Sequence, residues 1–128
     1  MKWLKPVLLA ITAALFLRVF VFDFIIAEGH SMEPSIHDGA VLIISRLRYG
    51  LRFPRRDSGR QYLTRWALPR TGEILIFYTP EGDLAVKRCV RTEGMYFYAE
   101  GDNSLASYDS RAYGPVPLEN IIGKVLEY

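Results

Sequence analysis

Two side chains of this sequence could form a reactive pair, the hydroxyl of Ser31 and the amine of Lys87. Ser31 lies in a turn-rich segment, where Gly29 permits a sharp turn and Pro34 stiffens the chain. A serine hydroxyl becomes a useful nucleophile when a neighbouring base removes its proton. The candidate bases are a lysine, Lys87, and a histidine, His37.

Lys87 belongs to the strand-like run LAVKRCVR, in which alternation places Ala85 and Cys89 on its own face and Arg88 on the opposite face. Such small neighbours solvate an ammonium group poorly. Burial would therefore lower the lysine pKa from about 10.4 toward about 8. A strand lysine whose amine reaches solvent is the alternative interpretation of the same pattern.

A histidine could serve instead, because His37 with Asp102 or Asp109 would make a Ser-His-Asp triad. His30 is adjacent to Ser31 and would point to the other side of an extended chain. The single cysteine excludes an intrachain disulfide and a cysteine-cluster metal site, and its apolar strand predicts inert packing. We expect neither a metal nor an organic cofactor.

The chain has 128 residues, half of them hydrophobic, which is enough for one domain with its own core. The helices and strands of this domain must position the reactive groups. The net charge of +2 is too small to indicate nucleic-acid binding. Short apolar runs separated by turns predict a mainly β, compact domain over residues 24–128. The predicted strands are Ala40–Ser45, Glu73–Tyr78, Leu84–Arg91, Met95–Ala99 and Ile121–Glu127.

The apolar residues gather at the N-terminus, in Trp3–Phe22. A helix of that length would span a bilayer if Lys5 and Arg18 reached opposite interfaces. We therefore predict an N-terminal transmembrane helix within a membrane anchor over residues 1–23. A cleaved signal is the alternative, but no small-residue cleavage site follows the apolar run. The basic N-terminus favours a cytoplasmic start, which places residues 24–128 on the extracytoplasmic side.

Residues 47–70 lack alternation and are predicted to form a loop excursion. From Arg46 to Arg70 the chain carries eight arginines against one acid, Asp57. Three aromatic residues are interleaved with them: Tyr49, Phe53 and Trp66. The segment is either a solvated loop or a contact for anionic lipid headgroups, to which each basic group contributes about 1 kcal/mol.

Several segments together resemble bacterial type I signal peptidases, in the order found in that family. The matching segments are Arg18–Asp23, Ser31–Ser35 (SMEPS, the serine box), Gly72–Phe77 (GEILIF), Val86–Arg88 (VKR, the lysine box), Gly101–Asn103 and Ser107–Pro117 (the last box). The resemblance extends from the apolar N-terminus to the C-terminal strand. It implies a compact β-domain of signal-peptidase type with one anchor.

The resemblance also implies residue roles. Ser31 would be the nucleophile, Lys87 the general base, and the backbone N–H of Ser31 an oxyanion donor. The supporting residues would be Ser107, which orients the lysine amine, the ion pair of Asp109 and Arg111, and Asp102 in the same network. Some family members carry a serine hydroxyl two positions before the nucleophile, where this chain has Gly29. The second oxyanion donor is therefore not identified.

By the same resemblance, the substrates would be signal peptides of exported preproteins, cut after a small residue with another small residue two before it. An extended peptide could add as a strand between Phe24–Gly29 and Asp83–Lys87. The expected substrate-binding residues are Ile26, Gly29, Met32, Ala85 and Val86. The implied location is the bacterial cytoplasmic membrane, with the lipid bilayer as partner and the secretion translocon as a further candidate.

Three other functions are compatible with the residues. One is a specialised peptidase of the same clan that matures a pilin or a conjugation protein. Another is an anchored β-domain that binds preproteins without cutting them. The third is the hydrolase with a Ser31–His37–Asp triad.

Overall fold

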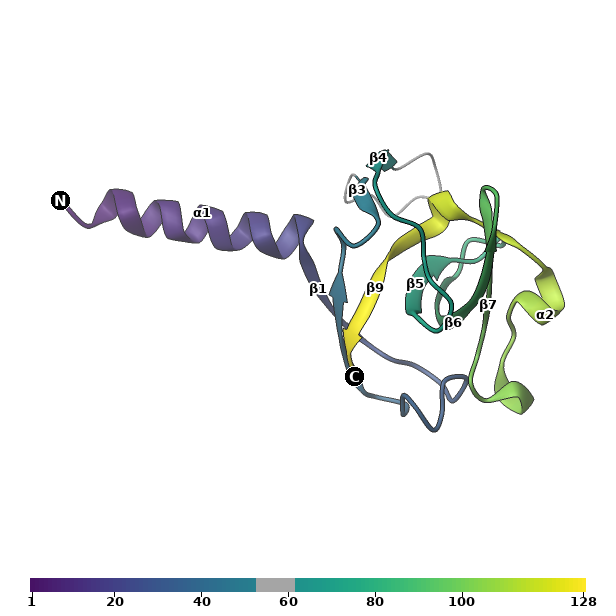
Figure 1. Cartoon of the computed structure of the whole chain (residues 1–128). Coiled ribbons are helices and arrows are strands. Elements are labelled where there is room, and N and C mark those ends of the chain that lie inside the picture. The colour runs from purple at the N-terminus through teal and green to yellow at the C-terminus, as the bar shows by residue number, and fades with distance from the viewer. Residues whose placement is uncertain (53–61) are drawn as a thin grey trace.

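The computed structural model describes residues 1–52 and 62–128 and shows a helix that leads into a curved β-domain (Figure 1). The helix α1 covers Leu4–Phe20. The strands of the main sheet are β1 (Phe22–Ile26), β2 (Val41–Ser45), β5 (Ile74–Tyr78), β6 (Leu84–Glu93), β7 (Tyr96–Glu100), β8 (Val116–Pro117) and β9 (Ile121–Glu127). The short elements are β3 (Gly50–Arg52), β4 (Tyr62–Arg65), the 3₁₀ turns Ser104–Ala106 and Leu118–Asn120, and α2 (Ser110–Tyr113).

The main sheet has seven antiparallel strands in the order β1-β2-β9-β5-β6-β7-β8. It curves into a half-barrel (Figure 1). Strand β5 lies at the centre of this order, and all its residues but the last are buried. In β2 and β7, by contrast, buried residues alternate with residues that are at least partly exposed. The mainly β fold predicted from the sequence is confirmed.

Two apolar clusters form the core of the sheet. One is centred on Phe77 and Phe97, whose rings meet edge to face with centroids 5.1 Å apart. The other contains Leu42, Ile44 and Ile76. Because side chains alternate along each strand, neighbouring residues of β5 supply both clusters and hold the curved sheet together.

The five predicted strands correspond to β2, β5, β6, β7 and β9, with ends within two residues of those observed. The segment 47–70, predicted to be a loop, contains two short strands, since β3 and β4 pair there as a separate two-stranded sheet. The pairing was missed because each strand is short and lacks apolar alternation. Residues 53–61 of the predicted loop lie outside the described residues.

The N-terminal helix is slightly shorter than the apolar segment Trp3–Phe22 from which it was predicted. It ends at Phe20, and Val21 closes it through a backbone hydrogen bond to Leu17. The next residues alternate apolar and polar types and pair with β2, so Phe22 and Asp23 belong to β1. In the described part of the chain, no helix has the combined length and hydropathy of a membrane span. The helix leaves the domain with most of its apolar side chains exposed.

We expect Phe97→Ala to lower the free energy of unfolding by about 3–5 kcal/mol, because it opens a cavity beside Phe77. Tyr96→Ala is the matched control, since the neighbouring ring is exposed and its removal should cost about 0.5 kcal/mol or less. Urea unfolding of both full-length variants in detergent measures the difference. Equal losses of stability would show that the Phe77–Phe97 contact does not hold the core.

Candidate active site

Ser31 lies in a loop after β1 that two buried side chains attach to the core. Gly29 adopts a φ of 86°, which turns the chain after β1. Directly after Ser31, Met32 is buried and its carbonyl accepts the backbone N–H of Ile36 at 2.9 Å. Ile36 is also buried, so two apolar side chains anchor the loop. Ser31 is thereby presented from a fixed turn.

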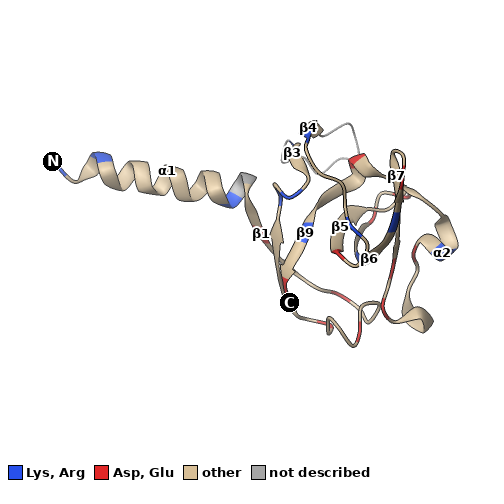
Figure 2. Cartoon of the chain, viewed as in Figure 1, with Lys and Arg blue, Asp and Glu red and all other residues tan. Residues whose placement is uncertain are grey.

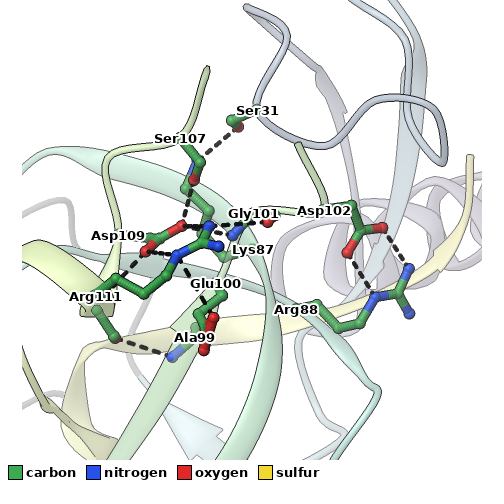
Figure 3. A network of polar contacts seen from close by, with 11 residues as sticks. Ser31, Lys87, Arg88, Ala99, Glu100, Gly101, Asp102, Ser107, Asp109 and Arg111 are labelled. Carbon is green, nitrogen blue, oxygen red and sulfur yellow. Dashed lines mark hydrogen bonds and ion pairs between the residues drawn. The ribbon is translucent and has the colours of Figure 1, made fainter. Parts of the chain in front are cut away.

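Lys87 points at Ser31 from the middle of β6, where it pairs in register with Leu75. Its side chain is only 7% exposed. The Lys87 amine donates a hydrogen bond to the Ser31 hydroxyl, with Nζ and Oγ 2.6 Å apart (Figure 3). The sequence interpretation in which the lysine reaches solvent is therefore wrong. A neutral amine at this distance could instead accept the serine proton.

Burial lowers the pKa of the Lys87 amine below its ordinary value. Of the nearby charges, the Asp109 carboxylate raises this pKa and the Arg111 guanidinium lowers it. Burial has the largest influence of the three, so the pKa is lowered on balance. The amine therefore loses its proton at a lower pH than an exposed lysine.

Asp109 is fully buried and remains ionised. Burial by itself would raise the pKa of this carboxyl, but hydrogen bonds from Arg111, Ser107 and backbone N–H groups hold it well below the ordinary value. The Ser107 hydroxyl donates at 2.5 Å, the Gly101 N–H at 2.8 Å and Arg111 Nη2 at 2.6 Å (Figure 3). These donors place Ser107 and Arg111 around one carboxylate beside the dyad.

Gly101 lies where three parts of the chain cross. A Cβ atom at this position would lie 2.2 Å from Ser107 Oγ and 2.5 Å from the carbonyl oxygen of Ser31, both closer than real contacts allow. The next turn residue, Asn103, donates its backbone N–H to that Ser31 carbonyl at 2.9 Å and its side-chain amide to the His30 carbonyl at 3.1 Å. The turn at 101–103 therefore supports the loop that contains Ser31.

Asp102, in the same turn, contacts both the serine loop and β6. Its carboxylate accepts two hydrogen bonds from Arg88, at 2.9 and 2.8 Å, and one from the Ser35 hydroxyl at 2.5 Å. Arg88 also donates to the Gly72 carbonyl at 2.8 Å. Since Arg88 follows Lys87 in β6, its ion pair with Asp102 ties the lysine strand to the turn at 101–103, and the Ser35 hydrogen bond ties that turn to the serine loop.

A groove with a volume of about 440 Å³ contains both Ser31 and Lys87. It runs between the end of β1 and the start of β6, the two edges predicted to receive a peptide. All the expected substrate-binding residues line it: Ile26, Gly29, Met32, Ala85 and Val86. Sequence reasoning missed Tyr108, which also lines the groove and donates its hydroxyl to Glu81 at 2.6 Å. Its place between Ser107 and Asp109 was the available signal.

The structure does not assemble the histidine alternative. His37 is exposed and its ring nitrogen lies 3.8 Å from Glu33. Asp102 and Asp109, the proposed triad carboxylates, are bonded to Arg88 and Arg111 instead. Cys89 is buried in the core, and burial raises the pKa of its thiol, as expected for an inert packing residue.

A comparison with protein families agrees with this geometry. The family described as "Signal peptidase, peptidase S26" matches residues 1–95 and 92–128, which together cover the whole chain. The chain belongs to this signal peptidase family. The family predicted from the sequence motifs is thereby confirmed, and with it the serine peptidase class.

Individual members of the family show how far the similarity extends. Signal peptidase I of Bacillus caldolyticus is 25% identical over 161 aligned positions, which cover 97% of this chain and 87% of the relative. Signal peptidase I of Bacillus licheniformis is 39% identical over 57 residues, or 44% of this chain and 31% of the relative. Signal peptidase I T of Bacillus subtilis is 37% identical over 46 residues, or 36% and 24% of the two chains. The higher identities are thus confined to short segments.

We expect Gly101→Ala to reduce kcat/KM on a signal-peptide substrate by about a hundredfold, because the new methyl group displaces Ser107 or the Ser31 backbone. Gly94→Ala is the control: a Cβ there meets nothing within 4 Å, and the strain of its φ of 57° should lower stability while leaving kcat/KM unchanged. Circular dichroism checks that both variants fold. Unchanged kinetics in folded Gly101→Ala would show that the close crossing does not position the dyad.

Proposed function

We propose that this chain removes signal peptides from exported preproteins, with Ser31 as nucleophile and Lys87 as general base. The observation that carries the proposal is the 2.6 Å contact between Lys87 Nζ and Ser31 Oγ at the bottom of a peptide-sized groove. The family membership supplies the reaction class. The same contact argues against a domain that binds preproteins without cutting them.

The proposed reaction runs through an acyl-enzyme. The neutral Lys87 amine takes the hydroxyl proton as Ser31 Oγ attacks the carbonyl carbon of the scissile bond. The resulting ammonium gives that proton to the leaving amine, which departs as the new N-terminus of the mature protein. Lys87 then takes a proton from water, whose oxygen attacks the acyl carbon, and returns it to Ser31 as the signal peptide leaves.

The supporting residues set the conditions for this proton transfer. The Ser107 hydroxyl donates its proton to a hydrogen bond with Asp109. The lone pairs of the Ser107 oxygen are therefore free to accept a hydrogen bond from the Lys87 amine. Arg111 holds Asp109 ionised and offsets its charge at the lysine. In the described residues no acceptor takes the backbone N–H of Ser31, so this group can donate to the oxyanion.

The groove suits an extended peptide with small side chains. Ile26, Met32 and Val86 wall it with apolar surface, while the exposed backbone at the edges of β1 and β6 can pair with an added strand. Alternate side chains of such a peptide point into the groove. A small residue at the cleaved bond and another two before it would enter shallow pockets there, and larger side chains would be excluded.

We also propose that α1 attaches the enzyme to the cytoplasmic membrane, with residues 1–23 as the anchor and residues 24–128 as the extracytoplasmic catalytic domain. The exposed apolar side chains along α1 support this attachment, because lipid would cover them. The lysines at positions 2 and 5 favour a cytoplasmic N-terminus. Anchoring confines enzyme and preprotein to one bilayer, where the secretion translocon delivers the substrate, and raises their effective concentration.

Ser31→Ala and Lys87→Ala should each lower preprotein processing on the order of 10⁴-fold or more, because each removes one half of the dyad. His37→Gln is the control and should process at the normal rate, since His37 lies outside the Ser31–Lys87 contact. Sequencing the N-terminus of the product identifies the cleaved bond. Full activity in either dyad variant would overturn the mechanism, and lost activity in His37→Gln would support the triad.

The rate should rise with pH as Lys87 loses its proton, with a midpoint below the ordinary lysine value of 10.5. Arg111→Gln should move this midpoint to higher pH, because it removes a positive charge that lowers the Lys87 pKa. Arg91→Gln, on an exposed part of β6, should leave the midpoint unchanged. The measurement is kcat/KM on a peptide across pH. A midpoint that stays the same in Arg111→Gln would exclude Lys87 as the titrating base.

A further inference from the structure

A second groove, of about 540 Å³, lies beside the β3–β4 hairpin and shares no lining residue with the groove at Ser31. We call it the arginine groove. Its described charged residues are Arg48, Arg65 and Arg70, and its large apolar residues are Trp66 and Leu68. None of the described residues that line it is acidic. The groove therefore combines positive charge with apolar surface.

The arginines are only partly neutralised by the protein. Arg48 lies 3.4 Å from Glu73, which does not itself line the groove. Arg65 stacks on the Tyr62 ring, with its guanidinium carbon 5.3 Å from the centroid. Stacking leaves the N–H edge of a guanidinium available for an anion. Within the described part of the chain, no ion pair holds Arg65 or Arg70.

The apolar members of the arginine groove are exposed, at 57% for Trp66 and 51% for Leu68. Leu63, on the adjoining strand β4, is 61% exposed. An exposed tryptophan among arginines is suited to the boundary between lipid headgroups and acyl chains, where the ring enters and the cations meet phosphates. A site for a small soluble anion would not need these apolar side chains.

The arginine groove is also close in the chain to the helix proposed to enter the membrane. At the foot of α1, the Arg46 N–H donates to the Val21 carbonyl at 2.7 Å, and Asp23 pairs with both Arg46 and Arg18. Two residues after Arg46 the chain reaches the groove, and Trp66 N–H donates to the Tyr49 carbonyl at 3.1 Å. Figure 2 shows basic residues on the segment that enters β3 and on β4.

We infer that the arginine groove binds the anionic phospholipid headgroups of the bilayer that holds α1. The inference rests on the proposed function for the nearness of that bilayer. The arginines contact the lipid phosphates, and Trp66 and Leu68 enter the interface beside them. Each arginine near an anionic surface should change the ratio of docked to undocked groove about fivefold.

The test uses Trp66 as its own probe. Because the chain has two tryptophans, Trp3→Phe leaves Trp66 as the only one. The full chain is reconstituted into phosphatidylcholine vesicles with or without phosphatidylglycerol, and quenching of Trp66 by brominated acyl chains is measured. We expect quenching and a blue-shifted emission with phosphatidylglycerol, and loss of both near 1 M salt, where the screening length is about 3 Å.

Single substitutions decide which residues are responsible. Arg65→Gln and Arg70→Gln should each lower the docked ratio about fivefold. Arg91→Gln removes the same charge from exposed β6 and should leave it unchanged. Equal quenching in both kinds of vesicle, an equal effect of Arg91→Gln, or a spectral shift with glycerol phosphate alone would each overturn the inference. Failure to float with phosphatidylcholine vesicles, or to process a preprotein, would instead count against the proposed function.

Discussion

The site depends on keeping one lysine amine dry beside a serine hydroxyl. Burial makes the charged, protonated form of Lys87 unfavourable, because little water can reach the amine. A carboxylate nearby has the opposite effect and stabilises the charged form. Asp109 is such a carboxylate, and it is fully buried. It accepts hydrogen bonds from Arg111, the Ser107 hydroxyl and the Gly101 N–H, and the positive charge of Arg111 acts against its effect on the lysine. Burial remains the largest influence on the Lys87 pKa and lowers it.

The residues around Asp109 also lie where the serine loop, β6 and the turn at 101–103 come together. The serine loop follows β1, the lysine lies in β6, and the turn at 101–103 follows β7, so nothing in the local chain brings them together. They meet because Gly101 has no side chain to separate them. Asn103 is also hydrogen-bonded to the serine loop, and Asp102 to both the serine loop and β6. Two buried apolar residues, Met32 and Ile36, then fix the serine loop to the core. A rigid scaffold of this kind holds reacting atoms at bonding distance before the substrate arrives.

A second set of ion pairs joins the β-domain to the N-terminal helix. Asp23, the one acidic residue of β1, is shared by Arg18 of α1 and Arg46 after β2. Arg18 donates to one of its carboxylate oxygens and Arg46 to the other, and the Phe24 N–H donates to the same oxygen as Arg18. It therefore stays charged and keeps the two arginines together where helix becomes strand. The arginine groove begins directly beyond this junction.

The sequence by itself determined the local features of this protein: the five main strands, the apolar N-terminal helix, the motifs that contain Ser31 and Lys87, and the family, because alternation, turn residues and short motifs are carried by neighbours along the chain. Sequence reasoning did not separate a buried from an exposed Lys87, extended the helix to Phe22, and overlooked Tyr108. Each of these was decided by tertiary structure. Burial, the pairing of β1 with β2 and the lining of a groove depend on residues far apart in sequence, whose packing energies outweigh local preference.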